Sequence, residues 1–190
     1  MKKVGILVGS LRKDSWSLKV AKAFMELDDS REYELMDISQ LEMYNQEYDE
    51  DIENLPVSYQ VFREKVTEKD AYIFITPEHN RSIPAVLKNA IDAASVPFGN
   101  SEWSHKPALI ISVSPGSLGG FGANHHLRQI LTSMNCYVMA QPEVYIGRIY
   151  QYVDENGDFK EDTMQFFAKI LNSFNEWIDQ TTEPYIAEKK

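Results

Sequence analysis

Short apolar runs alternate with longer segments of helical periodicity along most of the chain. The runs at 3–8, 71–76 and 108–113 are almost continuously apolar, as in strands that are buried on both faces of a parallel sheet. A run at 33–38 and another over roughly 137–147 complete the set of five predicted strands. This alternation of strand-like and helix-like segments predicts an α/β fold.

The segments between the runs have the apolar spacing of amphipathic helices. In 15–27, for example, Leu18, Ala21 and Phe24 fall on one stripe. Pro84 suits the first turn of a helix, where its missing N–H is no loss. Five parallel strands joined by crossover helices favour a flavodoxin-like three-layer sandwich, with the strand order 2-1-3-4-5 and helices on both faces. The predicted helices cover 15–27, 57–69, 84–95, 122–134 and 161–179.

Composition narrows the class of protein. The chain has 190 residues, of which 43% are hydrophobic, and this fits one domain over 1–190 with a charged, flexible tail at 180–190. The formal net charge of −10 argues against binding to nucleic acid or to an anionic membrane surface. No apolar run reaches the ~20 residues of a membrane span, and the N-terminal run is too short for a signal sequence. Cys136 is the only cysteine, so we interpret it as a small buried residue of a cytoplasmic protein.

Two further features leave alternatives open. Residues 45–56 are acidic and without periodicity, which is typical of a solvated loop but also of a lid or a subunit contact. His125 and His126 are adjacent on a predicted helix, so they cannot both face one metal ion. We interpret them as surface or interface residues and expect no metal site.

The loop after the first predicted strand, GSLRKDSWS, is unusually polar for a tight strand-to-helix turn. The hydroxyls of Ser10, Ser15 and Ser17 and the N-terminus of the next helix can donate hydrogen bonds to phosphate oxygens. Arg12 adds a planar charged group suited to phosphate. The alternative is a serine N-cap with Arg12 as an ordinary surface charge. The loop has neither Walker nor GxGxxG glycine spacing, so we expect a phosphate site of another type.

The loop after the third strand, PEHNRS, begins with a residue that ends the ladder, because Pro77 has no N–H to donate. Residues 78–81 then expose backbone amides and carbonyls, which can pair with the edge of a planar heterocycle. His79 can lie against the face of such a ring. In the alternative interpretation, Asn80 or Ser82 only caps the following helix.

The loop after the fourth strand, SPGSLGGFGA, holds four glycines within seven residues. Glycine allows a close approach of backbone to a ligand, and two serines add donors, although a floppy loop is the alternative. Because the carboxyl ends of parallel strands lie at one edge of the sheet, we expect all three loops to meet there. The residues concerned in this loop are Ser114, Gly116, Ser117, Gly119, Gly120 and Gly122.

Together the three loops resemble those of the NAD(P)H-dependent FMN reductase family, whose members include quinone, azo and chromate reductases. The resemblance rests on GSLRKDSWS, PEHNRSIPAVLKNAIDAAS and SPGSLGGFGANHHLRQIL and covers about residues 3–150. It implies an enzyme with FMN as cofactor and NAD(P)H as co-substrate, which reduces flavin, quinone, azo or similar small acceptors by ping-pong hydride transfer. It also implies a homodimer or homotetramer, with 84–95 in the assembly.

The resemblance further implies a role for each loop in binding FMN, and none as a side-chain acid or base. The phosphate would be held by Ser10, Arg12, Ser15 and Ser17. The edge and face of the isoalloxazine ring would be held by Pro77, Glu78, His79 and Asn80. The ring or ribityl chain would be flanked by Ser114, Gly116, Gly119 and Gly120. The family usually has asparagine, tyrosine and arginine at the positions of Ser17, His79 and Gly122.

Two other function classes are consistent with the same fold. The first is a one-electron flavodoxin-like carrier that docks to protein partners, although such carriers usually show a T-x-T-G-x-T phosphate loop, which this chain lacks. The second is a flavin-free binding domain. The sequence predicts neither the preferred nicotinamide nor the physiological acceptor.

Overall fold

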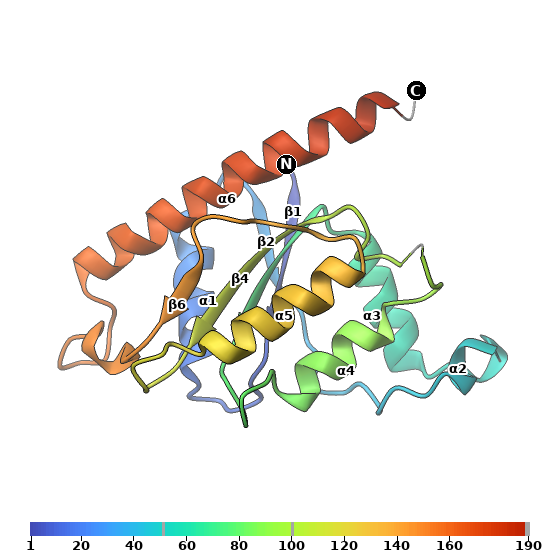
Figure 1. Ribbon diagram of the computed structural model, residues 1–190, viewed down its shortest axis with the longest axis horizontal. Helices are drawn as coiled ribbons and strands as arrows, with labels where there is room; N and C mark the ends of the chain where they lie inside the picture. The colour runs from blue at the N-terminus through green and yellow to red at the C-terminus, as the bar shows by residue number, and fades with distance from the viewer. Residues whose placement is uncertain (51, 100, 189–190) are drawn as a thin grey trace.

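The computed structural model describes residues 1–50, 52–99 and 101–188, and a parallel β-sheet forms its centre (Figure 1). The strand order β2-β1-β3-β4-β5 confirms the predicted topology, and β6 pairs with β4 as well. The paired strands are parallel throughout. The strands are β1 (Lys3–Val8), β2 (Glu32–Leu35), β3 (Ala71–Thr76), β4 (Pro107–Val113), β5 (Tyr137–Val138) and β6 (Val144–Ile146).

The fifth predicted strand is divided into two. β5 and β6 both pair with β4, at its beginning and its end respectively. Pro142 lies between them and has no N–H to donate to a ladder, so the chain leaves β4 and returns to it further along. The prediction of one continuous strand over 137–147 is therefore wrong in this detail.

Helices cover both faces of the sheet. α1 and α6 lie on one face, and α3, α4 and α5 on the other (Figure 1). α6 extends well past the predicted end at 179, and the flexibility of the tail stays a prediction. The acidic segment 45–56, predicted as an aperiodic loop, contains two short helices, α2 and η1, around residue 51, which lies outside the described residues. The helices are α1 (Trp16–Leu27), α2 (Glu47–Glu50), η1 (Ile52–Asn54), α3 (Val57–Thr67), α4 (Ala85–Ala93), α5 (Phe121–Ser133), η2 (Ile149–Gln151) and α6 (Glu161–Glu188).

Alternating side chains along the central strands build two cores. In β1, Val4 and Ile6 pack on the α1/α6 side while Leu7 packs on the other. Ile73 and Phe74 divide in the same way in β3. Because both faces are buried, these strands appear in the sequence as continuous apolar runs. In the described parts of the chain, no helix is both long enough and apolar enough to cross a membrane.

Cys136 is buried, as expected, and its thiol donates to the backbone oxygen of Trp103 at 3.2 Å. Burial raises the pKa of this thiol to about 12, against about 8.5 for a free cysteine. We therefore expect a chromogenic disulfide reagent to react with the folded protein at pH 8 at least about a hundredfold more slowly than with the denatured chain.

The same shift has a consequence for stability. Above about pH 8.5 the unfolded chain loses the thiol proton while the folded chain keeps it, so this group lowers the free energy of unfolding as pH rises. The rate of reaction with the disulfide reagent, measured with and without denaturant, tests the prediction of slow reaction. Equal rates would show that the Cys136 thiol is not buried.

Candidate functional site

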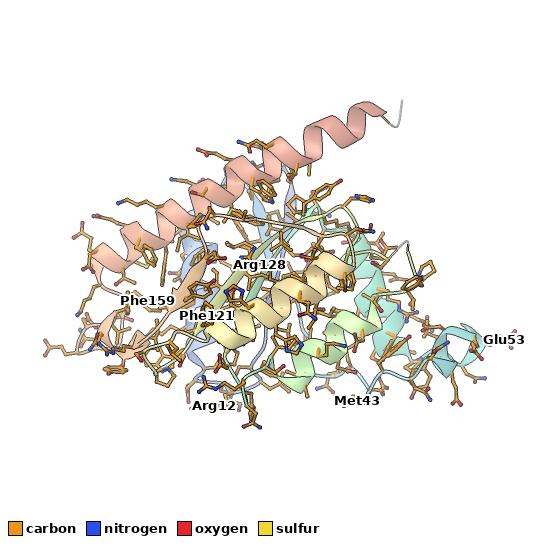
Figure 2. The ribbon with its side chains drawn as sticks, viewed as in Figure 1. Arg12, Met43, Glu53, Phe121, Arg128 and Phe159 are labelled. Atoms are coloured by element: carbon orange, nitrogen blue, oxygen red, sulfur yellow. The ribbon has the colours of Figure 1, made fainter. Side chains whose placement is uncertain are left out.

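The loops that follow β1, β3 and β4 meet at one edge of the sheet, as predicted. Gly9 lies against the β3 loop, since a Cβ atom there would be 3.3 Å from Cδ of Pro77. Glu78 in turn accepts a hydrogen bond from the N–H of Ala123, after the β4 loop, at 3.2 Å. Figure 2 shows Arg12 of the β1 loop at the same lower edge of the molecule. One surface therefore carries all three polar loops.

Ser15 is the N-cap of α1, and its Oγ accepts from the N–H of Leu18 at 3.1 Å. The capping role is thus confirmed, but the hydroxyl hydrogen stays available to donate to an anion. The N–H groups of Trp16 and Ser17 find no acceptor within the described residues. The first turn of α1 therefore offers free backbone donors at the positive end of the helix dipole.

Arg12 and Ser10 lie next to this helix end because the loop folds back on itself. The N–H of Ser15 donates to the carbonyl of Arg12 at 3.2 Å, and the N–H of Arg12 lies 3.4 Å from Oγ of Ser10. Arg12 is exposed, and in the described parts of the chain its side chain forms no ion pair. Hydroxyls, free amides and one uncompensated guanidinium form a donor set that fits a phosphate dianion.

The β3 loop is a tight turn. His79 and Ser82 exchange two backbone hydrogen bonds, of 2.8 and 3.0 Å. Between them Asn80 and Arg81 have positive φ angles of 49° and 67°, which is the backbone of a type I′ turn. The turn presents His79 and Asn80 to solvent at its tip.

The alternative role of this loop as a simple helix cap is wrong. α4 is preceded by Pro84 and has no side-chain cap. The hydroxyl of Ser82 instead lies 2.7 Å from Nδ1 of His126 on α5. The N–H groups of Glu78 and Asn80 have no partner among the residues the structure describes, so both can bond to the edge of a heterocycle.

Glu78 has a role that the sequence analysis missed. One carboxylate oxygen accepts from the N–H of Ala123, in the first turn of α5, and the other pairs with Arg81 at 3.1 Å. α5 begins after Gly120, which has a left-handed backbone and no side chain to cap the helix. The sequence GGFGA offers no side chain that can cap this helix. It therefore indicates that an acceptor from elsewhere in the chain must bond to the free N–H groups of the first turn.

We expect Glu78→Ala to lower the free energy of unfolding by about 1 kcal/mol, because it removes this cap. Glu78→Gln keeps an acceptor oxygen at the same place and should cost less. Denaturant unfolding of both variants measures the difference. Equal losses in the two variants would show that the contact with α5 does not carry the effect.

Two glycines of the β4 loop, Gly119 and Gly120, are required by packing within the chain. Gly119 has a φ of +62°, and a Cβ atom there would lie 2.7 Å from the carbonyl carbon of Tyr145. Gly120 has a φ of +75°, and its Cβ would lie 3.0 Å from Cβ of Ser112. On the other side of this contact, a Cβ atom at Gly147 would lie 2.5 Å from the backbone oxygen of Ser117 in the β4 loop. Atoms of the chain itself therefore make the close approach to these glycines that was expected of a ligand.

Hydrogen bonds within the chain also hold the start of the β4 loop. The Oγ of Ser114 accepts from the N–H of Gly116 at 2.9 Å, and the carbonyl of Gly116 accepts from the N–H of Arg148 at 3.0 Å. The N–H groups of Gly119 and Gly120 have no acceptor in the described chain. These free amides lie near the β3 loop, since a Cβ atom at Gly120 would be 3.7 Å from Cβ of Glu78. The residues present therefore fit a flavin whose phosphate lies at α1.

The two adjacent histidines behave as predicted, since each faces a different partner. His125 lies 3.0 Å from the hydroxyl of Tyr145, and His126 from that of Ser82 at 2.7 Å. Both histidines are exposed. They therefore do not converge on one ion.

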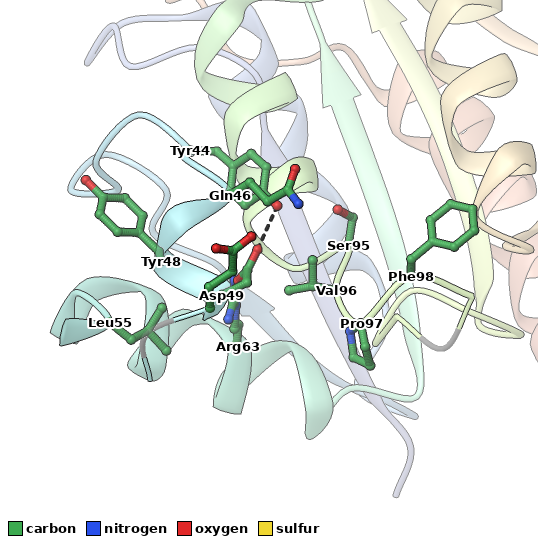
Figure 3. A pocket seen from close by; sticks show the side chains of 11 residues that line it. Tyr44, Gln46, Tyr48, Asp49, Leu55, Arg63, Ser95, Val96, Pro97 and Phe98 are labelled. Atoms are coloured by element: carbon green, nitrogen blue, oxygen red, sulfur yellow. Dashed lines mark hydrogen bonds and ion pairs between the residues drawn. The ribbon is translucent and has the colours of Figure 1, made fainter. Parts of the chain in front are cut away.

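A pocket of about 630 Å³ lies outside these loops, between the acidic segment and the turn after α4 (Figure 3). Three of its polar side chains are paired with one another, because Asp49 accepts from the Tyr44 hydroxyl at 2.7 Å and pairs with Arg63 at 2.6 Å. None of the predicted site residues lines it. We place the candidate site at the strand-end loops, where the free donors and the uncompensated charge lie.

Comparisons with known proteins identify the family of the chain. Residues 2–151 match the family model of NADPH-dependent FMN reductases. The chain is 44% identical to a quinone reductase from Pseudomonas putida over 176 residues, which cover 92% of this chain and 94% of the relative. It is 37% identical to a 2-hydroxy-1,4-benzoquinone reductase from a Burkholderia species over 178 residues, which cover 93% and 96% of the two chains.

Solved structures extend the comparison. The flavoenzyme NAD(P)H:acceptor oxidoreductase FerB from Paracoccus denitrificans superposes with a TM-score of 0.86 at 34% identity, over 95% of this chain and 99% of that one. A flavodoxin variant from Pseudomonas aeruginosa has a TM-score of 0.59 at 16% identity, a likeness of fold alone. Because the family model spans most of the sequence and close relatives cover nearly all of it, the chain belongs to the NADPH-dependent FMN reductase family.

Proposed function

We propose that this protein is an FMN-dependent oxidoreductase that uses NAD(P)H to reduce quinones and similar small acceptors, including flavin and azo compounds. The observation that carries the proposal is that the β1 loop, with Arg12, its serines and the free amides of α1, lies at the same edge of the sheet as the free amides of the β3 loop. Relatives with 44% and 37% identity are named as quinone and benzoquinone reductases. FMN, when bound, would supply two-electron chemistry, the transfer of a hydride from the nicotinamide to the acceptor.

The residues of the chain position the cofactor. Ser10, Arg12, Ser15 and Ser17 would bind the phosphate. The turn at 77–80 would present its free amides to the edge of the ring, where such donors stabilise developing negative charge. In the β4 loop, Ser114, Gly116, Gly119 and Gly120 would flank the ring or the ribityl chain. No side chain is assigned as an acid or base. The nicotinamide and the acceptor would bind in turn at one face of the flavin, which would give ping-pong kinetics.

The absorbance of the purified protein tests this proposal first. We expect a yellow protein with about one FMN per chain and steady NAD(P)H oxidation with benzoquinone, with parallel lines in double-reciprocal plots. A colourless protein that takes up no added FMN would favour a flavin-free binding domain. Flavin that is reduced only by a partner reductase would favour an electron carrier.

We also propose that the protein is a homodimer or homotetramer. Phe98, Met43 and Val57 are large apolar side chains with exposed fractions of 102%, 72% and 72%, of the kind that a subunit interface covers. Asn89 lies in the segment 84–95 that is expected in the assembly, and within the chain it is buried and accepts from the N–H of Tyr44 at 2.7 Å. Light scattering measures the mass in solution, and a monomer at micromolar concentration would contradict the proposal.

We further propose that residues 1–190 act as one FMN-binding domain in the cytoplasm. One continuous sheet with a core on each face supports a single domain. The buried Cys136 thiol suits a reducing compartment. Limited proteolysis that yields one resistant fragment, and fractionation of cells, test the two statements separately.

A further inference from the structure

A second pocket, of about 390 Å³, lies on the flank of α1 directly beside the phosphate loop. Its volume is within the range of small-molecule sites. It shares Ser15 with the phosphate loop, so a ligand that lies along this edge can reach both. The residues that line it are Lys13, Asp14, Ser15, Trp16, Leu18, Lys19 and Lys22.

The three lysines of this pocket carry uncompensated charge. Several other lysines have carboxylate partners, as Lys88 has in Asp92 at 2.7 Å. Lys13, Lys19 and Lys22 form no ion pair or side-chain hydrogen bond with any described residue. Asp14 is the one carboxylate that lines the pocket. In a chain with a net charge of −10, three free cations around one pocket create a local positive site for an anion.

Aromatic rings give this pocket a second chemical character. Nζ of Lys19 lies 6.0 Å from the ring centroid of Trp16 and 5.6 Å from that of Phe159. Figure 2 shows Phe159 on the flank of the molecule, above the edge that carries Arg12. Nζ of Lys19 would also lie 3.6 Å from a Cβ atom at Gly157, in the turn before Phe159. An indole face offers stacking to a planar base while the ammonium groups offer charge to a phosphate.

We propose that this pocket binds the adenosine 2′-phosphate end of NADPH. Lys19 and Lys22 are three residues apart on α1 and therefore point to the same side of the helix, where both can pair with the phosphate. Trp16 would lie against the adenine. Dinucleotide-binding proteins commonly discriminate for the 2′-phosphate with a basic side chain. The inference rests on the proposed function, and it makes NADPH the preferred donor over NADH.

Calorimetric titration of the FMN-loaded protein tests binding without turnover. The probe is 2′,5′-ADP, and 5′-AMP is the control that lacks the 2′-phosphate. Because a charged hydrogen bond contributes a factor of about ten or more, we expect 2′,5′-ADP to bind at least about tenfold more tightly than 5′-AMP. The double variant Lys19→Gln/Lys22→Gln should abolish that difference. Equal affinities in the unsubstituted protein, or equally good competition by inorganic phosphate, would overturn the proposal.

Steady-state kinetics give the second measurement. In the double variant we expect the KM for NADPH to rise about tenfold, with kcat and the KM for NADH unchanged. Lys169→Gln is the matched control, since Lys169 is an exposed lysine of α6 whose side chain has no partner in the described chain. Equal rises for NADPH and NADH would overturn the proposal.

If the double variant does not fold, Lys22→Gln alone removes an exposed charge and should raise only the KM for NADPH, in the same direction. Absence of NADH and NADPH oxidation by the unsubstituted holoprotein would count against the proposed function. The difference between 2′,5′-ADP and 5′-AMP binding still decides the role of the lysine pocket in that case.

Discussion

Replacing Arg12 and Ser15 together by alanine should weaken FMN binding by roughly 10²- to 10⁴-fold. The change removes the guanidinium and one hydroxyl from the predicted phosphate site, and each hydrogen bond to a charged group contributes about 1.5–3 kcal/mol. Arg12 has no ion pair among the described residues, so its loss leaves no buried partner unsatisfied. Quenching of flavin fluorescence on titration of the apoprotein gives the dissociation constant.

Ser15 needs a control of its own because it also caps α1. Ser15→Ala should lower the free energy of unfolding by about 1 kcal/mol, whereas Ser15→Gly should cost only a few tenths. Both remove the hydroxyl, so both should weaken FMN binding to a similar extent. Lys169→Ala, which removes a charge from α6, should leave FMN binding unchanged. Unaltered FMN affinity in the Arg12/Ser15 double variant would show that this loop does not hold the phosphate of FMN.

The fold was predictable where burial leaves a pattern in the sequence. β1 and β3 have the predicted bounds, because strands buried on both faces must be apolar at every position. The place of the three polar loops then follows from topology, since parallel strands end at one edge. The split between β5 and β6 was not predictable from hydrophobicity, because the run 137–147 is apolar on either side of the interruption.

The candidate site was predictable in its composition but not in its internal contacts. Ser15 was expected to bind phosphate or to cap α1, and the structure shows the cap. Glu78 was expected to act through its backbone, but its side chain serves α5, which is distant in sequence. Asn89, a polar residue on an apolar helix face, holds the segment that follows β2. Such contacts join residues that are far apart in the sequence, and no local sequence pattern indicates them.

Gly119→Ala is the second change with a large expected effect. A left-handed backbone costs a residue with a Cβ atom about 1–2 kcal/mol. The added methyl group would also lie 2.7 Å from the carbonyl carbon of Tyr145 and 2.9 Å from the nitrogen of Gly147. These are backbone atoms, which cannot rotate away as a side chain can, and overpacking of this kind adds about 1–3 kcal/mol. We therefore expect the free energy of unfolding to fall by about 2–5 kcal/mol.

Gly99→Ala is the matched control, because Gly99 has a φ of +79° but no atom within 4 Å of an added Cβ. Gly99→Ala should lower the free energy of unfolding only by the backbone cost of about 1–2 kcal/mol. Urea unfolding of both variants therefore isolates the contribution of the contact at Gly119. Since the contact at Gly119 sets the β4 loop against the residues after β6, its loss should also weaken FMN binding, whereas Gly99→Ala should not. Equal destabilisation by the two substitutions would mean that the β4 loop can move away from β6 at no cost, and its glycines would then be explained by the ligand alone.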